Sequence, residues 1–331
     1  MRFADAVRVW ALLTALTGTN AVAQATDAER RAAEPGELLG PETTLNARTD
    51  ILARMTVDVM INGQGPFAFA VDTGADRTAI SAGLAARLKL PAGEDVSLNG
   101  MAGIDRVRTV TIARLDIGTH HLVNVRAPAL KDGDLGVAGL LGIDALAGHR
   151  IVMDFDAAKL TLRSSTVKPD SAETSGDGET ITVLAKRRFG QLVLVDASIN
   201  GKKVYAIVDS GAQITVGNLA LRRLMTREGG SRRGVPIELI SVTGRKLSAD
   251  LTTMPTIRLG GFELSNVQVA YSDAHPFKKF GLLKQPALLL GADVLQSFKR
   301  VSLDFESKKV RFLLKPNAFM EQRQAVAIAL P

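Results

Sequence analysis

One stretch of this sequence occurs twice, and that repetition constrains the fold more than any other feature. "FAVDTGADRTAI" begins at Phe69 and "AIVDSGAQITVG" begins at Ala206, so that Asp72 and Asp209 lie 137 residues apart at equivalent positions. Each copy has a strand and turn before the stretch, then a helical segment, two hairpins, an apolar "LLG" segment and a closing strand pair. Self-similarity in the same order indicates an internal duplication.

The duplicated unit is dominated by strand signals. Its apolar runs are short, rich in Val, Ile, Leu and Thr, and separated by turns of Gly, Asn and Asp. Helical pattern is limited to the segments after each Asp turn and after each "LLG". We therefore expect a mainly β protein with two lobes, residues 51–163 and 181–315.

Three segments lie outside the predicted lobes and the leader described below. Residues 164–180 are polar, acidic and turn-prone, which is typical of a linker. Residues 24–50 are predicted to form a loose N-terminal arm, and residues 316–331 a C-terminal tail that is either a packed helix or a disordered end.

Residues 1–23 have the pattern of a secretory signal peptide. Arg2 and Arg8 supply positive charge, Val9–Gly18 is a short apolar core, and Ala21–Ala23 is a small-residue cleavage site. The alternatives are a short buried helix and an uncleaved anchor. We expect a periplasmic or secreted protein without a stable membrane span, because no other apolar run is long enough to cross a bilayer.

Composition excludes several classes of site. The chain has no cysteine, which excludes disulfides, thiolate zinc sites and a cysteine nucleophile. Its net charge is +7, but the basic residues are scattered rather than clustered, so we expect no nucleic-acid partner. The two histidines within Thr119–His121 are predicted to lie in a solvated hairpin turn. We expect no metal and no organic cofactor.

The repeated Asp turns suggest a specific chemistry. An apolar strand running into Asp-Thr-Gly or Asp-Ser-Gly presents a carboxylate on a tight turn, and Gly74 and Gly211 allow close approach of another group. If the lobes pack about a two-fold axis, Asp72 and Asp209 meet there. Two carboxyls in contact share one proton, so that one acts as a base toward water and the other as an acid.

These motifs resemble those of the aspartic proteases, most closely the retropepsin-like (retroviral-type) family, with two units fused in tandem. The resemblance rests on "VDTGAD" and "VDSGAQ", together with "LLG" at Leu140–Gly142 and Leu289–Gly291. It implies a pepsin/retropepsin-like fold in which a pseudo-two-fold axis relates the two lobes and the active-site cleft lies between them. It also implies that Asp72 and Asp209 are the catalytic pair and that the two "LLG" segments pack beneath them as ψ-shaped loops. In this reading Thr73 and Ser210 cross-link the two active-site loops, which Gly74 and Gly211 complete.

The resemblance also implies two flaps that close over a peptide. No tyrosine lies on either glycine hairpin, which favours the two-flap retropepsin arrangement over a single pepsin-like flap. Asp76 matches a substrate-binding acidic position, whereas Gln213 replaces it in the second copy, so the two ends of a peptide should be treated differently. The predicted flap residues are Gly100, Met101, Ala102 and Gly103 in the first copy and Thr243 and Gly244 in the second.

The sequence therefore predicts a monomeric aspartic endopeptidase whose partner is a peptide or protein substrate. Ala75 and Ala212 replace hydroxyl residues that would lower the pKa of the carboxyls, so we expect a pH optimum nearer neutral than that of an acid protease. The alternative is a non-catalytic peptide-binding protein that keeps the same fold.

Overall fold

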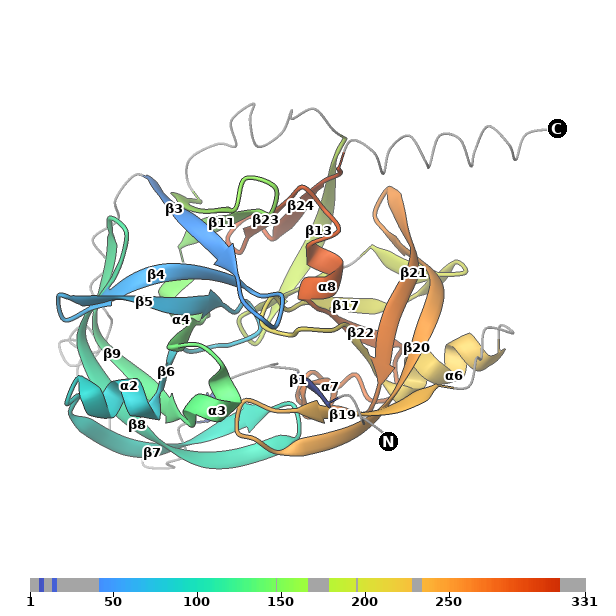
Figure 1. Cartoon of the computed structure of the whole chain (residues 1–331). Coiled ribbons are helices and arrows are strands. Elements are labelled where there is room, and N and C mark those ends of the chain that lie inside the picture. The colour runs from blue at the N-terminus through green and yellow to red at the C-terminus, as the bar shows by residue number, and fades with distance from the viewer. Residues whose placement is uncertain are drawn as a thin grey trace, which may run out of the picture.

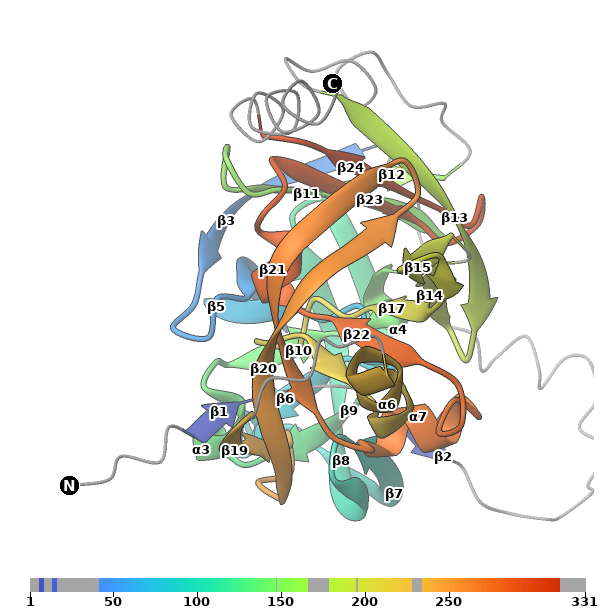
Figure 2. The same cartoon turned by 90° about the vertical axis from the view of Figure 1, so that its right-hand side faces the viewer.

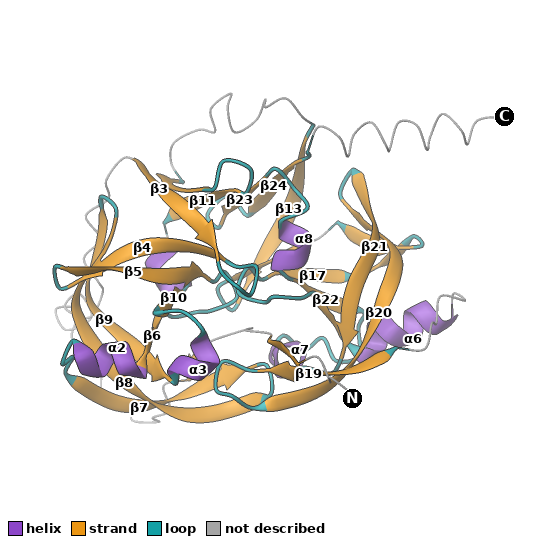
Figure 3. Cartoon of the chain, in the orientation of Figure 1, coloured by secondary structure: helices purple, strands orange, loops and turns teal. Residues whose placement is uncertain are grey.

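The computed structural model describes residues 6–8, 14–16, 42–146, 148–165, 179–194, 196–227 and 234–315. Figure 1 shows two β-rich lobes side by side, joined by strands along one edge and by long curved hairpins along the opposite edge. Figure 3 shows that the helices of the described part are short and lie around the sheets. The prediction of a mainly β protein is confirmed. No helix within the described ranges is long and apolar enough to span a membrane.

The first lobe begins earlier than the sequence suggested. Its elements are β3 Glu42–Thr49, β4 Met55–Ile61, β5 Gln64–Val71, β6 Ala79–Ser81, α2 Ala82–Arg87, β7 Ala92–Gly100, β8 Gly103–Ile117, β9 His120–Leu130, α3 Asp132–Leu135, β10 Gly139–Leu141, α4 Ile143–Leu146, β11 His149–Asp154 and β12 Lys159–Ser164. Residues 42–49, assigned above to the loose arm, form strand β3, which pairs with β12 and β4. The polar Thr and Asn residues of this edge strand gave little apolar signal.

The second lobe repeats this order. Its elements are β13 Thr180–Arg188, β14 Gln191–Leu194, β15 Ala197–Ile199, β16 Lys202–Lys203, β17 Tyr205–Val208, β18 Val216–Gly217, α6 Leu219–Arg227, β19 Val235–Ile240, β20 Lys246–Leu259, β21 Phe262–Tyr271, α7 His275–Lys279, β22 Ala287–Leu290, α8 Ala292–Leu295, β23 Arg300–Asp304 and β24 Lys309–Leu313. Two further strands, β1 Ala6–Arg8 and β2 Thr14–Leu16, lie in the N-terminal segment. The described residues of the linker and tail regions are few, and 166–178 and 316–331 lie outside the described part.

Each lobe has a ψ-shaped core of three strands. In the first, β10 lies parallel to β5 and antiparallel to β6; in the second, β22 lies parallel to β17 and antiparallel to β18. The "LLG" segments therefore pair with the strands that lead into the two Asp turns. The backbone N–H groups of Asp72 and Asp209 donate to the carbonyls of Leu141 and Leu290 at 2.9 and 3.0 Å, which fixes where each strand ends.

One continuous sheet joins the lobes. Its order is β3–β12–β11–β23–β24–β13, and the junction is the antiparallel pair β11–β23. Two ion pairs lie across this junction, Arg150–Asp304 at 3.8 Å and Arg300–Asp154 at 2.6 Å, and all four side chains are largely buried. Apolar side chains from both halves of the sheet belong to one core cluster, among them Ile151, Met153, Leu303 and Phe312. Figure 2 shows this sheet on the side opposite the hairpins.

Candidate active site

Asp72 and Asp209 are the first residues after β5 and β17, and both side chains are buried, with 1% and 0% exposure. Asp72 Oδ1 accepts hydrogen bonds from the backbone N–H groups of Gly74 and Ala75 at 2.9 and 3.0 Å. Asp209 Oδ1 accepts from those of Gly211 and Ala212 at 3.1 and 3.2 Å. In each carboxyl one oxygen is thus held by its own turn, and Oδ2 has no hydrogen-bond partner among the described residues.

The two Asp turns pack directly against each other. A Cβ atom built on Gly74 would lie 2.3 Å from Asp209 Oδ1, and one built on Gly211 would lie 2.2 Å from Asp72 Cγ. Real Cβ contacts are never this short, so only glycine permits the approach. The structure therefore brings together the two carboxyls that the duplication placed 137 residues apart.

Thr73 and Ser210 connect the two turns through reciprocal hydrogen bonds. Thr73 Oγ1 donates to the carbonyl of Val208 at 3.3 Å and accepts from the backbone N–H of Ser210 at 3.0 Å. Ser210 Oγ donates to the carbonyl of Val71 at 2.8 Å and accepts from the backbone N–H of Thr73 at 3.1 Å. Both hydroxyls are buried, so these four bonds satisfy groups that water cannot reach.

Burial and mutual repulsion favour the protonated forms of the two carboxyls. Burial raises the pKa of Asp72 to about 7, although the N–H groups of Gly74 and Ala75 oppose the shift. Burial, and then the charge of Asp72, raise the pKa of Asp209 well above its ordinary value. The pair therefore holds a proton at pH values at which isolated Asp side chains are ionised.

This geometry agrees with the comparisons with known protein families. A family model described as gag-polyprotein putative aspartyl protease matches residues 57–148, and one described as aspartyl protease matches residues 195–294. The chain carries two retropepsin-like aspartyl protease domains in tandem. The resemblance inferred from the sequence is confirmed. No curated protein matches the chain.

Each protease domain braces its Asp turn with a buried Thr–Asp pair. Thr78 Oγ1 donates to Asp144 at 2.8 Å, and Thr215 Oγ1 donates to Asp293 at 2.9 Å. The acidic residues also accept the backbone N–H groups of the same threonines. Asp144 and Asp293 lie inside the first turn of α4 and α8, and they connect these helices to the chain just after each Asp turn.

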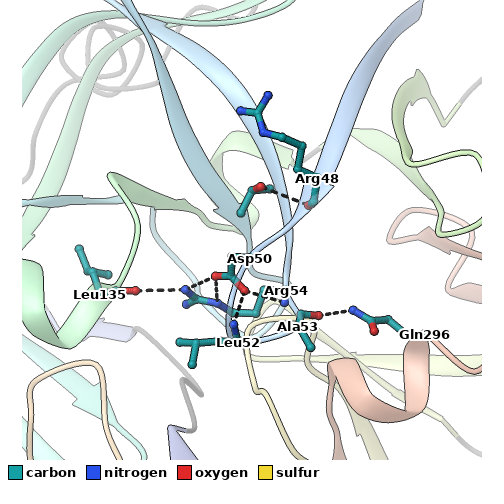
Figure 4. A network of polar contacts seen from close by, with 8 residues as sticks. Arg48, Asp50, Leu52, Ala53, Arg54, Leu135 and Gln296 are labelled. Carbon is teal, nitrogen blue, oxygen red and sulfur yellow. Dashed lines mark hydrogen bonds and ion pairs between the residues drawn. The ribbon is translucent and has the colours of Figure 1, made fainter.

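A buried arginine beside the first turn was not found from the sequence. Figure 4 shows Arg54 paired with Asp50 at 2.5 Å and donating to the carbonyl of Leu135 at 3.1 Å. Asp50 also accepts the backbone N–H groups of Leu52 and Arg54, both at 2.9 Å. The charge of Arg54 lowers the pKa of Asp72, which lies in the same domain. An isolated Arg before a strand has no distinguishing pattern in a single sequence.

The predicted flap residues lie at the ends of two hairpins, β7–β8 and β19–β20, which touch each other. Gly100 faces Ser241, and Gly103 faces the Arg245 side chain. Thr243 Oγ1 donates to Asp105 at 2.7 Å, and Arg245 lies 3.5 Å from the same carboxylate. The remaining predicted residues are at the same tips: Met101 and Ala102 form the first turn, and Gly244, with φ +78°, faces Asp134.

The tip of each flap carries an apolar side chain that is buried in the core of the opposite domain. Met101, from the first domain, is fully buried in a cluster whose other members, including Ala212 and Phe277, come from the second. Val242, from the second domain, is buried in a cluster whose other members, including Ala75 and Leu140, come from the first. Each flap tip is thus buried among apolar side chains of the opposite domain, in the core cluster that also holds the alanine after that domain's Asp turn, which is a closed position of the flaps.

The two domains differ in charge at the second residue after the glycine of each Asp turn. Asp76 pairs with Lys279 of α7 at 3.3 Å, and Lys279 also lies 5.2 Å from the Phe189 ring centroid. Burial raises the pKa of Asp76 to about 6, against the opposing effect of Lys279. A cavity of about 310 Å³ adjoins this pair and is lined by Phe189, Gly190 and Asp144 among others. Gln213 occupies the equivalent position in the second domain and bears no charge.

Contrary to the prediction, His120 and His121 do not lie in a solvated turn but begin strand β9. His120 is 2% exposed and packs edge-to-face on His149, with ring centroids 4.6 Å apart. Burial, followed by the neighbouring His149, lowers the pKa of His120 to about 4. The two residues are distant in sequence, and only the fold of the first domain brings their rings together. Among the described residues, no group of three His, Asp or Glu side chains is arranged to hold a metal ion.

Proposed function

We propose that the chain is an aspartic endopeptidase that hydrolyses peptide bonds with Asp72 and Asp209. The observation that supports this most strongly is the mutual approach of the two Asp turns, each with one carboxyl oxygen anchored and the other unpartnered. The unpartnered oxygens can hold one water molecule. The ionised carboxyl takes a proton from that water as it attacks the substrate carbonyl, while the protonated carboxyl donates a proton to the carbonyl oxygen.

The closed flaps support an extended substrate bound beneath them. Because both carboxyls are buried, a substrate can enter only when the Met101 and Val242 tips separate from the opposite domain. Once closed, the flaps exclude bulk water and offer strand edges to the peptide backbone. The apolar surroundings favour substrates with apolar residues next to the cleaved bond.

A digest of casein and of a peptide library tests the proposal. The wild-type chain should cleave, and both Asp72→Asn and Asp209→Asn should abolish cleavage, because either change leaves the pair without its base or without its acid. Asp156→Asn removes an exposed carboxyl from a distant turn and should leave activity unchanged. Binding of peptides by the wild-type chain without turnover would instead favour the non-catalytic peptide-binding function.

Export remains part of the proposal. The charge, apolar core and small-residue site of residues 1–23 support removal of this segment on passage across a membrane. Sequencing the N-terminus of the protein recovered from periplasm or medium tests it. A chain that retains Met1 in the cytoplasm would contradict export.

A further inference from the structure

The two copies of the duplicated unit differ at one buried position before the Asp turn. When "VDVMING" is aligned with "VDASING", Arg54 corresponds to Leu192, since each lies three residues before the first valine of its stretch. Both residues are buried, with 0% and 1% exposure. The first domain therefore holds a positive charge in its core where the second holds an apolar side chain.

Arg54 is fixed in this core next to the turn that holds Asp72. Its Nε and Nη2 atoms donate to Asp50 Oδ2 at 2.8 and 2.5 Å, and Nη2 also donates to the carbonyl of Leu135 at 3.1 Å (Figure 4). Leu135 belongs to the same core cluster as Ala75, whose backbone N–H donates to Asp72 Oδ1. A buried charge is screened less than an exposed one, so the guanidinium acts on the neighbouring carboxyl.

The charge of Arg54 makes the two buried carboxyls unequal. In both, burial raises the pKa and two backbone N–H groups of the same turn oppose the shift. The charge of Arg54 also lowers the pKa of Asp72, and the smaller opposite effect comes from Asp76, which is paired with Lys279. The charge that acts on Asp209 is that of Asp72, and it raises the pKa. Since two carboxyls in contact do not both ionise at neutral pH, the negative charge is favoured on Asp72.

We propose that Arg54 assigns the two roles within the pair, so that Asp72 is the base that takes a proton from water and Asp209 is the acid that donates the shared proton to the substrate carbonyl. The roles rest on the proposed function, whereas the location of the charge is a property of the resting chain. Arg54 acts through Asp72 and is therefore a positioning residue.

The assignment fixes the path of each proton. As the water oxygen bonds to the carbonyl carbon, one water proton passes to Asp72 and the proton of Asp209 passes to the carbonyl oxygen. The negative charge of the pair is then on Asp209. As the C–N bond breaks, Asp72 gives its proton to the leaving nitrogen and Asp209 recovers one from a hydroxyl group, which restores the resting pair.

The location of the charge can be measured without any turnover. The nuclear magnetic resonance signal of an Asp carboxyl carbon moves as the carboxyl ionises, and comparison with Asp72→Asn and Asp209→Asn assigns the two signals of the pair. In the unmodified full-length chain, the Asp72 signal should make most of its change in the step at lower pH and the Asp209 signal in the step at higher pH. The opposite order, or an equal share of both steps, would overturn the proposal.

Neutral replacement of the buried ion pair tests the contribution of Arg54. Arg54→Gln with Asp50→Asn removes both charges together, so neither is left buried without its partner. In the Asp209→Asn chain this change should raise the pKa of Asp72 by about one unit. In the Asp72→Asn chain it should move the pKa of Asp209 much less. A shift at Asp209 as large as that at Asp72, or none at Asp72, would contradict the proposal. If the double variant fails to fold, the order of ionisation in the unmodified chain still decides.

Arg48→Gln with Asp58→Asn is the matched control. This ion pair joins the same two strands, β3 and β4, but its side chains are 60% and 40% exposed. Its removal should leave the pKa of Asp72 unchanged. A shift as large as that caused by removing the buried pair would mean that Arg54 has no specific effect on the carboxyl.

Activity supplies a second, separable readout. The acid limb of the pH profile of kcat/KM reports the ionisation of the base, so Arg54→Gln with Asp50→Asn should move this limb to higher pH by about one unit. At pH values below the limb, kcat/KM should fall about tenfold. Arg54→Lys keeps the positive charge and should keep the wild-type profile.

The activity measurement distinguishes the proposal from its alternatives. A loss of kcat/KM that is the same at every pH would indicate a merely structural role of Arg54 and would overturn the proposal. If no form of the chain cleaves any peptide, the endopeptidase function fails, and the order of ionisation of Asp72 and Asp209 still decides which carboxyl carries the charge.

Discussion

The buried Asp pair makes the stability of the folded chain depend on pH. Burial raises the pKa of Asp72 from 3.8 to about 7, so the folded state binds this proton more tightly than the unfolded state does. The resulting stability is fully present below the unfolded pKa and is lost as pH rises through the folded pKa.

Asp72→Asn should remove this loss, because an amide cannot ionise. We expect the variant to be more stable than wild type by roughly 2–4 kcal/mol at about pH 8 and equally stable at about pH 3.5. Urea unfolding followed by circular dichroism at the two pH values measures the difference. Asp156→Asn, at an exposed turn, is the control and should show no such dependence. A destabilising effect of Asp72→Asn at high pH would contradict the assignment of a buried, repelling pair.

The raised pKa values also predict the pH at which the proposed peptidase is most active. Activity needs one shared proton, so it should peak between the two apparent pKa values of the pair, nearer neutral pH than in an acid protease. A pH–rate profile of kcat/KM measures this. Maximal activity only below about pH 4 would contradict the prediction.

The reciprocal bonds of Thr73 can be tested by a single change. Thr73→Val keeps the shape of the side chain but leaves the N–H of Ser210 and the carbonyl of Val208 buried without partners. We expect a loss of about 1–3 kcal/mol in the free energy of unfolding, together with a large fall in kcat. Thr73→Ser retains the hydroxyl and should recover most of both. Full activity in Thr73→Val would show that the cross-link does not position the carboxyls.

At the scale of elements, the burial of Met101 and Val242 in the opposite domain stabilises the closed position of the two flaps. Met101→Ala removes most of a side chain that is fully buried against the second domain. Opening of the first flap should become easier by about 2 kcal/mol or more. Hydrogen exchange of amides 96–104 should therefore accelerate, and KM should rise.

Ile104→Ala is the matched control, because Ile104 lies on the same hairpin but is 48% exposed. It should change neither exchange nor KM. Similar exchange rates and KM values in the two variants would mean that the burial of Met101 does not keep the flap closed.

The sequence predicted the elements better than their contacts. Strands, Asp turns and "LLG" segments carry local signals, namely alternation, glycine and apolar runs, and the duplication showed how the copies correspond. The burial of Met101 and Val242 in the opposite domain has no local signal in the sequence, because it depends on how the two lobes pack together. For the same reason the sequence indicated neither the burial of Arg54 nor the contact of His120 with His149.

At the scale of the whole molecule, the sheet between the lobes depends on two buried ion pairs. Arg300→Met should destabilise the fold by about 3–5 kcal/mol, because Asp154 would keep a buried charge without its partner. Arg300→Met with Asp154→Leu should recover much of the loss. Urea unfolding measures both.

An exposed pair provides the comparison for this experiment. Arg258 and Glu263 lie 3.2 Å apart on the β20–β21 hairpin and are about half exposed. Arg258→Met should cost no more than about 1 kcal/mol. An equal cost for Arg258→Met and Arg300→Met would show that the inter-lobe pair is no more important than a surface contact.

The continuous sheet β3–β12–β11–β23–β24–β13 has a consequence for how the proposed activity depends on protein concentration. Both carboxyls belong to one polypeptide, so the site is assembled by folding rather than by an encounter between two molecules. Turnover per molecule should stay constant from micromolar to trace amounts of protein. Each half can also change its sequence without imposing the same change on the other, as Asp76 and Gln213 already illustrate.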